Sequence, residues 1–234
     1  MILRNSAKVP TTSAPSIQSF VECFEKSLEI AESVLCITVS CKFSSSLDVA
    51  RLAADYLRQR IGNNDAITVL DSGTASGAEG LIATEALRRA ASGLNIDEVS
   101  QFSQKIAQKV SLLAFPETLY YIWKSGRVPR IAHIGSSILD IKPIFEMKHG
   151  KVGSVARVRS RTRAIQRLVD MVCAKSSNPI HFTVIHADCK NDAENLLRML
   201  HEKCDVKESF VSEFTPAMGS HIGPGLLGVA FWHE

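Results

Sequence analysis

Apolar residues recur along the first half of the chain with two different spacings. Where they fall every three or four positions they predict amphipathic helices, and where they form short continuous runs they predict buried strands. Strands that alternate with helices over short connections are typical of a parallel α/β sheet. The expected strands cover residues 34–39 and 66–70, and the expected helices cover residues 17–28, 47–61, 78–91 and 97–113.

The pattern changes near Phe115-Pro116, after which short strand-like segments dominate. Strands that follow one another closely, mixed with only two helices, indicate an α+β layer with a mixed or antiparallel sheet. We therefore expect two domains, an N-terminal α/β domain over residues 1–114 and a C-terminal α+β domain over residues 115–234. In the second domain the expected strands are residues 131–133, 142–147, 152–158, 180–186, 208–214 and 226–232, the helices are 162–174 and 193–204, and a turn is expected at 148–151.

Composition narrows the class of protein only slightly. The net charge of +3 over 234 residues does not indicate a protein that coats nucleic acid. No apolar run approaches the roughly 20 residues that a membrane-spanning helix needs. The six cysteines form no Cys-x-x-Cys pair and no secretory signal precedes them, so reduced thiols in a cytoplasmic protein are expected.

A glycine-rich stretch close to the C-terminus, Gly219 to Gly225, is the most informative local pattern. Its three glycines and Pro224 prescribe backbone conformations, and the apolar run that follows is expected to be a closing strand. His221 is therefore expected to be held by a stiff loop at the entrance to that strand. A histidine beside glycines can also be a turn residue with no further role.

Three polar segments could carry chemistry. The hydroxyl groups of residues 11–16 precede a helix, where helix capping alone would explain them. Ser44, Ser45 and Ser46 lie between a strand and a helix, where backbone N–H groups favour an anion. A helix cap needs only one serine, so three are more than capping requires. Arg157, Arg159 and Arg161 would share one face of a strand, and a solvated basic face is the usual explanation of such a pattern.

Taken together and in order, these segments resemble the DegV family of bacterial fatty-acid-binding proteins, which includes the binding subunits of fatty acid kinase. The resemblance covers essentially the whole chain. The segments that carry it are Thr12 to Ser16, Ile37 to Ser46, Val69 to Ser72, Ser125 to Val128, Gly135 to Ile144, Val158-Arg159 and Gly219 to Gly225.

The resemblance implies a two-domain protein with a long-chain fatty acid in a tunnel between the domains and its carboxylate at the cleft. A buried carboxylate needs several donors or a paired charge, and two hydroxyls, a guanidinium and an imidazole would supply them. About 14 buried methylenes would contribute about 11 kcal/mol before ordering costs. The expected ligand-binding residues are Thr12 and Ser44 as donors, Arg159 as the cation, His221 as the imidazole, and Ser13, Ser46 and Gly219 beside them.

The chain departs from the family pattern at several positions. Ser44-Ser45-Ser46 replaces the usual Ser-Gly-Thr, so a side chain at Ser45 could crowd the head group, and Ala14 and Ser125 replace a glutamine and a glycine. Family members usually have about fifty further residues before the Thr-Ser-x-Pro motif. The expectation is therefore a shortened first domain with an exposed sheet edge that favours association.

We expect a lipid carrier with no catalytic residues, cofactor or metal, because no Gly-x-Ser-x-Gly elbow or phosphate-binding loop is present. A separate ATP-binding subunit of a fatty acid kinase would be its partner, and transient contact with a membrane is compatible with this role. Two alternatives stay open: a serine hydrolase that uses Ser44, Asp71 and His221, and a nucleic-acid-binding module built on residues 157–167.

Overall fold

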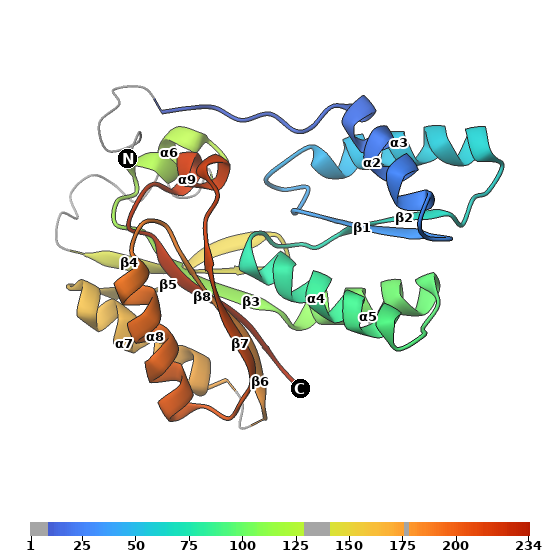
Figure 1. The fold of residues 1–234 in the computed structure, drawn as a ribbon. Helices are drawn as coiled ribbons and strands as arrows, with labels where there is room; N and C mark the ends of the chain where they lie inside the picture. The colour runs from blue at the N-terminus through green and yellow to red at the C-terminus, as the bar shows by residue number, and fades with distance from the viewer. Residues whose placement is uncertain (1–8, 129–140, 176–177) are drawn as a thin grey trace.

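The computed structural model describes residues 9–128, 141–175 and 178–234 and contains two separate β-sheets (Figure 1). The expected strand at residues 131–133 and part of the motif that begins at Gly135 lie outside the described residues. None of the helices in the described ranges is both long and apolar enough to cross a bilayer.

The smaller sheet has two parallel strands, β1 (Val34–Thr38) and β2 (Ile67–Asp71). Two helices pack against it, α2 (Ile17–Leu28) and α3 (Ser46–Ile61). The buried face of α3 is rich in alanine, which lets this helix approach closely. The buried core of this part consists of Val21, Phe24, Ala50, Ala53, Ala54, Leu57, Ala66 and Ile67.

The larger sheet has six strands in the order β5-β4-β3-β8-β6-β7. All neighbouring pairs are antiparallel except β6 and β7, which are parallel. The expected mixed sheet in the second half of the chain is therefore confirmed. The strands are β3 (Ser111–Phe115), β4 (Lys142–Lys148), β5 (Lys151–Val158), β6 (Ile180–His186), β7 (Val206–Glu213) and β8 (Leu227–His233).

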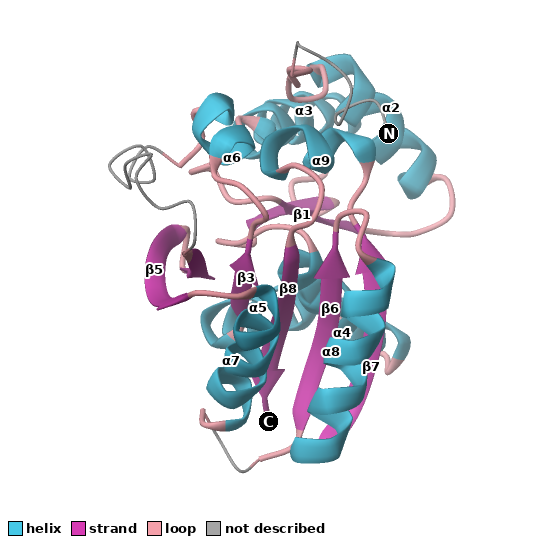
Figure 2. Cartoon of the chain, turned by 90° about the vertical axis from the view of Figure 1, so that its left-hand side faces the viewer, coloured by secondary structure: helices cyan, strands magenta, loops and turns pink. Residues whose placement is uncertain are grey.

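Helices cover both faces of the larger sheet (Figures 1 and 2). One face packs against α4 (Gly77–Ala91) and α5 (Ile96–Lys109), and the other against α7 (Arg161–Cys173) and α8 (Lys190–Lys203). Successive residues of each strand point to opposite faces. In β3, for example, Leu113 joins the core beneath α7 and α8, whereas Ala114 joins the core beneath α4 and α5.

The structure corrects the expected helix over residues 97–113. That helix, α5, ends at Lys109, and residues 111–115 form β3, which pairs with β4 and β8. The apolar run continues the helical spacing, but hydrogen bonding to two neighbouring strands determines the backbone here. The expected boundary at residue 115 placed most of β3 in the first domain, but β3 pairs with strands of the second half of the chain.

Two short helices were not anticipated, α6 (Tyr120–Ser125) and α9 (Pro216–Ile222), and they pack against each other (Figure 1). His221 therefore lies in the last turn of α9 and not in the loop that was expected. The sequence carried the signals for α9. Thr215 caps it, Pro216 opens it and Gly223 ends it.

A tight turn between β4 and β5 brings the two sheets into contact. His149 and Gly150 both have positive φ, as the expected turn at residues 148–151 requires. The N–H of Gly150 donates to the carbonyl oxygen of Gly73, which lies in the loop after β2. The hairpin of the larger sheet therefore touches the connection between the smaller sheet and α4.

The expectation of six reduced thiols is wrong for two of them. Cys173 ends α7 and Cys204 follows α8, and because these helices pack side by side, the two cysteines form a disulfide across 31 residues of sequence. The other four cysteines, Cys23, Cys36, Cys41 and Cys189, are free thiols.

Reducing the Cys173–Cys204 disulfide should lower the free energy of unfolding by about 3 to 4 kcal/mol, because the open loop gains conformational entropy in the unfolded chain. Urea unfolding with and without a reductant measures the difference. A variant with serine at both positions should show no response to the reductant. A wild-type protein that unfolds identically in both conditions would contradict the prediction.

Candidate functional site

A cavity of about 310 Å³ lies where loops of the smaller sheet face the larger one. Its polar end is formed by the N-terminal segment, the residues after α6, and α9. Its apolar wall comes mainly from the strands of the larger sheet and from α9. The wall contains Val39, Phe43, Leu112, Ala114, Ile122, Phe145, Met147, Ile185, Phe214, Met218, Ile222 and Leu226.

Three side chains from distant parts of the sequence form a hydrogen-bonded cluster at the polar end. Thr12 Oγ1 lies 2.8 Å from His221 Nε2, and Arg127 contacts both residues. Arg127 Nη2 donates to Thr12 Oγ1 at 3.1 Å, and Nη1 lies 3.3 Å from His221 Nδ1. All three residues are half-buried and line the cavity.

This geometry fixes where the protons of the cluster lie. A guanidinium only donates, so Nδ1 of His221 must accept from Arg127, and the imidazole proton is on Nε2. Nε2 then donates to Thr12 Oγ1, which already accepts from Arg127. The hydroxyl proton of Thr12 is consequently available to a further acceptor, such as an oxygen atom of a ligand in the cavity.

Arg127 brings positive charge to the polar end. Among residues 9–128, 141–175 and 178–234, no carboxylate forms an ion pair with this guanidinium. A half-buried guanidinium favours an anion nearby, because an opposite charge compensates for the loss of hydration. The cavity therefore combines apolar walls with an anion-binding end.

The serines before α3 contribute at another part of the lining. Ser44 lines the cavity, and its Oγ lies 2.8 Å from Ser46 Oγ and accepts from the backbone N–H of Ser46. Ser45, where the family pattern has glycine, is exposed and has a φ of −82°. Its side chain therefore neither strains the backbone nor crowds the cavity.

The predicted site residues divide into two groups. Thr12, Ser13, Ser44 and His221 all line the cavity, and Ser46 contacts it through Ser44. Gly219 and Arg159 do not line the cavity. Gly219 is buried inside α9, where its N–H donates to the carbonyl of Thr215, and Arg159 is exposed after the end of β5.

The cation at the cavity is Arg127, which lies in the Ser125 to Val128 segment of the family resemblance but was not among the predicted site residues. It follows Gly126, whose φ of +68° ends α6 in a left-handed turn. That turn directs the next residue back toward α9. A glycine directly before an arginine at a helix end was the available signal.

The hydrolase alternative requires His221 to accept a proton from Ser44 and to be oriented by Asp71. Both ring nitrogens of His221 are instead engaged by Thr12 and Arg127. Asp71 accepts from the backbone N–H groups of Cys41 and Gly73. The geometry thus does not assemble the arrangement that would activate a serine nucleophile.

The arginine-rich segment does not form the single basic face that was expected. β5 ends at Val158, and Arg161 begins α7, so Arg161 does not continue the strand alternation of Arg157 and Arg159. Arg161 is also engaged within the protein, since it donates to Asp192, Glu117 and the carbonyl of Gly225.

The pKa of His221 leads to a prediction about stability. Burial, and then the neighbouring Arg127, lower this pKa below the usual value of about 6.5. The unfolded chain therefore binds more protons at acid pH, so the contribution of His221 to stability is present above about pH 6.5 and decreases as the pH falls. The loss of melting temperature between about pH 7.5 and about pH 5 should be smaller in His221→Gln than in wild type.

Wild type and His221→Gln must be compared, because Glu79 changes the stability in the opposite direction as the pH falls. Burial, and then Asp71, raise the pKa of Glu79 to about 7, so its contribution is lost as the pH rises. The contribution of Glu79 is the same in wild type and in the variant, so it cancels when their pH profiles are compared. Identical pH profiles of melting temperature for the two proteins would contradict the lowered pKa of His221.

A family model described as "Uncharacterised protein, DegV family" matches residues 2–234. The chain belongs to the DegV family. Among curated proteins, this DegV chain is 27% identical over 232 residues to a DegV domain-containing protein of Clostridium acetobutylicum, which corresponds to 98% of this chain and 81% of the relative.

Solved DegV structures share the fold. A DegV protein from Thermus thermophilus, whose structure is described as showing fatty acid binding, superposes with a TM-score of 0.89 at 25% identity, covering 99% of this chain and 81% of that one. A lipid-binding DegV protein from Thermotoga maritima gives a TM-score of 0.87 at 25% identity, covering 98% and 79%. The expected DegV architecture is therefore confirmed.

Proposed function

We propose that this DegV protein binds a long-chain fatty acid in the 310 Å³ cavity, with the carboxylate at Thr12, Arg127 and His221. The observation that carries the proposal is an apolar cavity closed at one end by hydrogen-bond donors and a guanidinium. The fatty acid and lipid binding described for the proteins from Thermus thermophilus and Thermotoga maritima supports the same ligand class.

The two ends of the ligand have different roles in this proposal. Each buried methylene contributes about 0.8 kcal/mol, so the acyl chain supplies most of the affinity. The carboxylate accepts from the Thr12 hydroxyl and pairs with Arg127, which prevents the charge from being buried without partners. Ser44 and Ser13 provide further hydroxyl groups along the lining. The polar end thus orients the acid more than it tightens binding.

The finer part of the proposal is that the protein presents the carboxylate to a separate ATP-dependent fatty acid kinase. The polar end is accessible enough for this role, because Thr12 and His221 are half-buried and Ser13 is exposed. Adding a purified kinase subunit and labelled ATP to the loaded protein should give acyl phosphate. Absence of product would remove the kinase role and leave fatty acid binding intact.

Native mass spectrometry of the full chain purified from a bacterial host tests the binding proposal. We expect an added mass that matches an acid of about 14 to 18 carbons, released on denaturation and identified in the organic extract. Delipidated protein should take up the same acid at one molecule per chain. A chain that carries no acid and takes up none after delipidation would overturn the proposal.

A further inference from the structure

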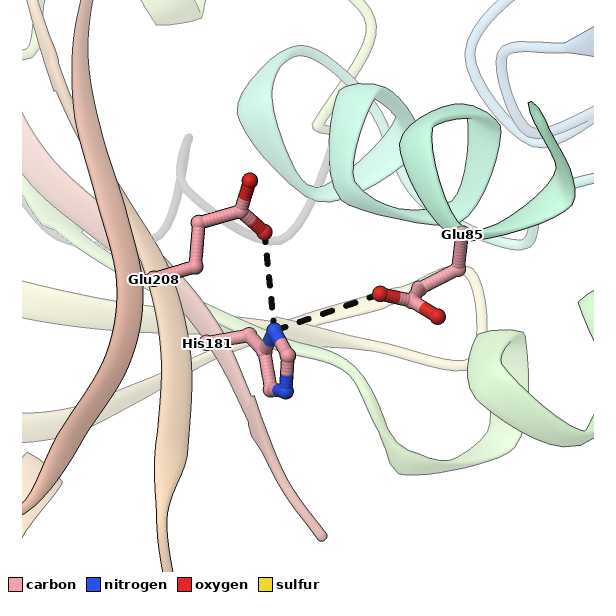
Figure 3. Close-up of side chains that lie close together, drawn as sticks. All are labelled: Glu85, His181 and Glu208. Carbon is pink, nitrogen blue, oxygen red and sulfur yellow. Dashed lines mark ion pairs between the residues drawn. The ribbon is translucent and has the colours of Figure 1, made fainter. Parts of the chain in front are cut away.

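A second cluster of chemistry-bearing side chains lies outside the fatty acid cavity. Glu85 of α4, His181 of β6 and Glu208 of β7 converge, and their ligand atoms all lie within 4.8 Å of one another (Figure 3). The side chains of Glu85 and His181 are each only 7% exposed. Three elements that are separate in sequence therefore place two carboxylates and an imidazole at one point.

The imidazole of His181 is held in a defined orientation. Its ring stacks on Trp232 with the centroids 4.3 Å apart, and Nε2 lies 3.2 Å from a carboxylate oxygen of Glu234. A carboxylate accepts, so Nε2 carries a proton and donates to Glu234. Within the described part of the chain, Nδ1 is buried and has no hydrogen-bond partner.

Nδ1 faces two further carboxylates. Nδ1 lies 3.5 Å from Glu208 Oε2 and 3.9 Å from Glu85 Oε1. Dashed lines mark these two pairs in Figure 3. Ligand atoms bound at about 2.0 to 2.2 Å around a tetrahedral zinc ion lie about 3.3 to 3.6 Å apart. The two distances to Nδ1 are thus close to those between ligands of one metal ion, and a small shift of Glu85 toward His181 would complete the set.

Charge also favours a cation at this point. Arg88 pairs with both Glu85 and Glu208, and its contact with Glu208 uses Oε1, which leaves Oε2 directed at His181. Glu234 contacts the other ring nitrogen, so three carboxylates surround the imidazole while Arg88 pairs with only two of them, and Lys109 lies farther out, 5.7 Å from the centroid of the Trp232 ring.

We propose that Glu85, His181 and Glu208 form a binding site for a divalent transition-metal ion of the Zn²⁺ type. An imidazole with two carboxylates suits zinc better than magnesium or calcium, which prefer oxygen ligands. Glu234 accepts from Nε2, so Nδ1 is the nitrogen that would bind the ion, and Arg88 hydrogen-bonds the ligating carboxylates, as outer partners do in known metal sites. The ion would join α4, β6 and β7.

The first test uses the full chain, stripped with a chelator and dialysed into metal-free buffer. Calorimetric titration with ZnCl₂ should show one saturable site per chain, and zinc should raise the melting temperature. MgCl₂ at the same concentrations should show neither effect. Substitution of Co²⁺ should give a visible spectrum without a thiolate band, which separates this site from binding at the exposed Cys23 and Cys41.

Matched variants locate the site. Glu208→Gln and Glu85→Gln should each weaken zinc affinity about tenfold or more. Glu146→Gln is the control, because Glu146 also pairs with a cation, Lys175, but lies on β4 outside the cluster. It should bind zinc like wild type. Unchanged affinity in both cluster variants would overturn the proposal.

A measurement on the wild-type protein does not depend on whether the variants fold. Zinc should shift the ¹⁵N resonance of His181 Nδ1 and leave Nε2 protonated toward Glu234. An ordinary ion pair between a protonated histidine and the two glutamates would instead show both nitrogens protonated and no response to zinc. That result, or the absence of a saturable zinc site, would overturn the proposal.

Discussion

Replacing Arg127 with glutamine is expected to weaken fatty acid binding by about tenfold to a hundredfold, the range that loss of a hydrogen bond to a charged group produces. Glutamine retains a donor toward Thr12 but removes the guanidinium charge at the polar end of the cavity. It also removes the donor that fixes the tautomer of His221. Titration of delipidated protein with a fluorescent fatty acid measures the change.

Arg159→Gln is the matched control for this experiment. Arg159 is exposed and does not line the cavity, so the same change of charge should leave the affinity unaltered. If Arg127→Gln bound as tightly as wild type, or if Arg159→Gln lost the ligand, the placement of the carboxylate would be wrong. The fold should be intact in both variants, because both residues are at least partly exposed.

Replacing Gly223 with alanine is expected to lower the free energy of unfolding by about 2 to 6 kcal/mol and to weaken fatty acid binding as well. Gly223 has φ 74° and ψ 166°, a region that is essentially restricted to glycine and costs other residues about 1 to 3 kcal/mol. A Cβ atom there would also overlap the ring of Tyr121, which adds about 1 to 3 kcal/mol of overpacking. Urea unfolding measures the loss.

The effect on binding follows from the position of Gly223 at the end of α9, next to the turn that carries His221. Gly80→Ala is the control, since Gly80 lies inside α4 with open space around its Cβ position. Alanine there should stabilise the protein by about 0.5 to 1 kcal/mol because it favours the helix. Equal stability of the two variants would show that the conformation of Gly223 is not needed.

Much of the fold was predictable where periodicity was long and uninterrupted. The expected helix over residues 17–28 coincides with α2, and the expected strand over residues 180–186 coincides with β6. The prediction was wrong where an apolar run satisfied two patterns at once. Leu113 continues the helical spacing of α5, yet pairing with Glu146 of β4 and Val229 of β8 determines its strand conformation. Such long-range hydrogen bonds leave no local trace in the sequence.

The polar end of the site was predictable only in part, for a related reason. Thr12, Ser44 and His221 stand in distinctive local patterns, and the structure brings them to one cavity. The sequence offered several arginines in similar surroundings. Whether Arg127 or Arg159 reaches the cavity depends on the left-handed turn after α6 and on where β5 ends, and both are features of the folded chain.

The extended segment over residues 9–16 connects the polar end of the cavity directly to α2 (Figure 1). Thr12 is anchored by Arg127 and His221, and Ser16 caps the helix by accepting from the N–H of Ser19. A bound ligand that immobilises Thr12 therefore also restrains the N-terminal end of α2. Protease cleavage within residues 9–16 should consequently slow as the cavity fills, so the cleavage rate reports how much of the protein carries a ligand.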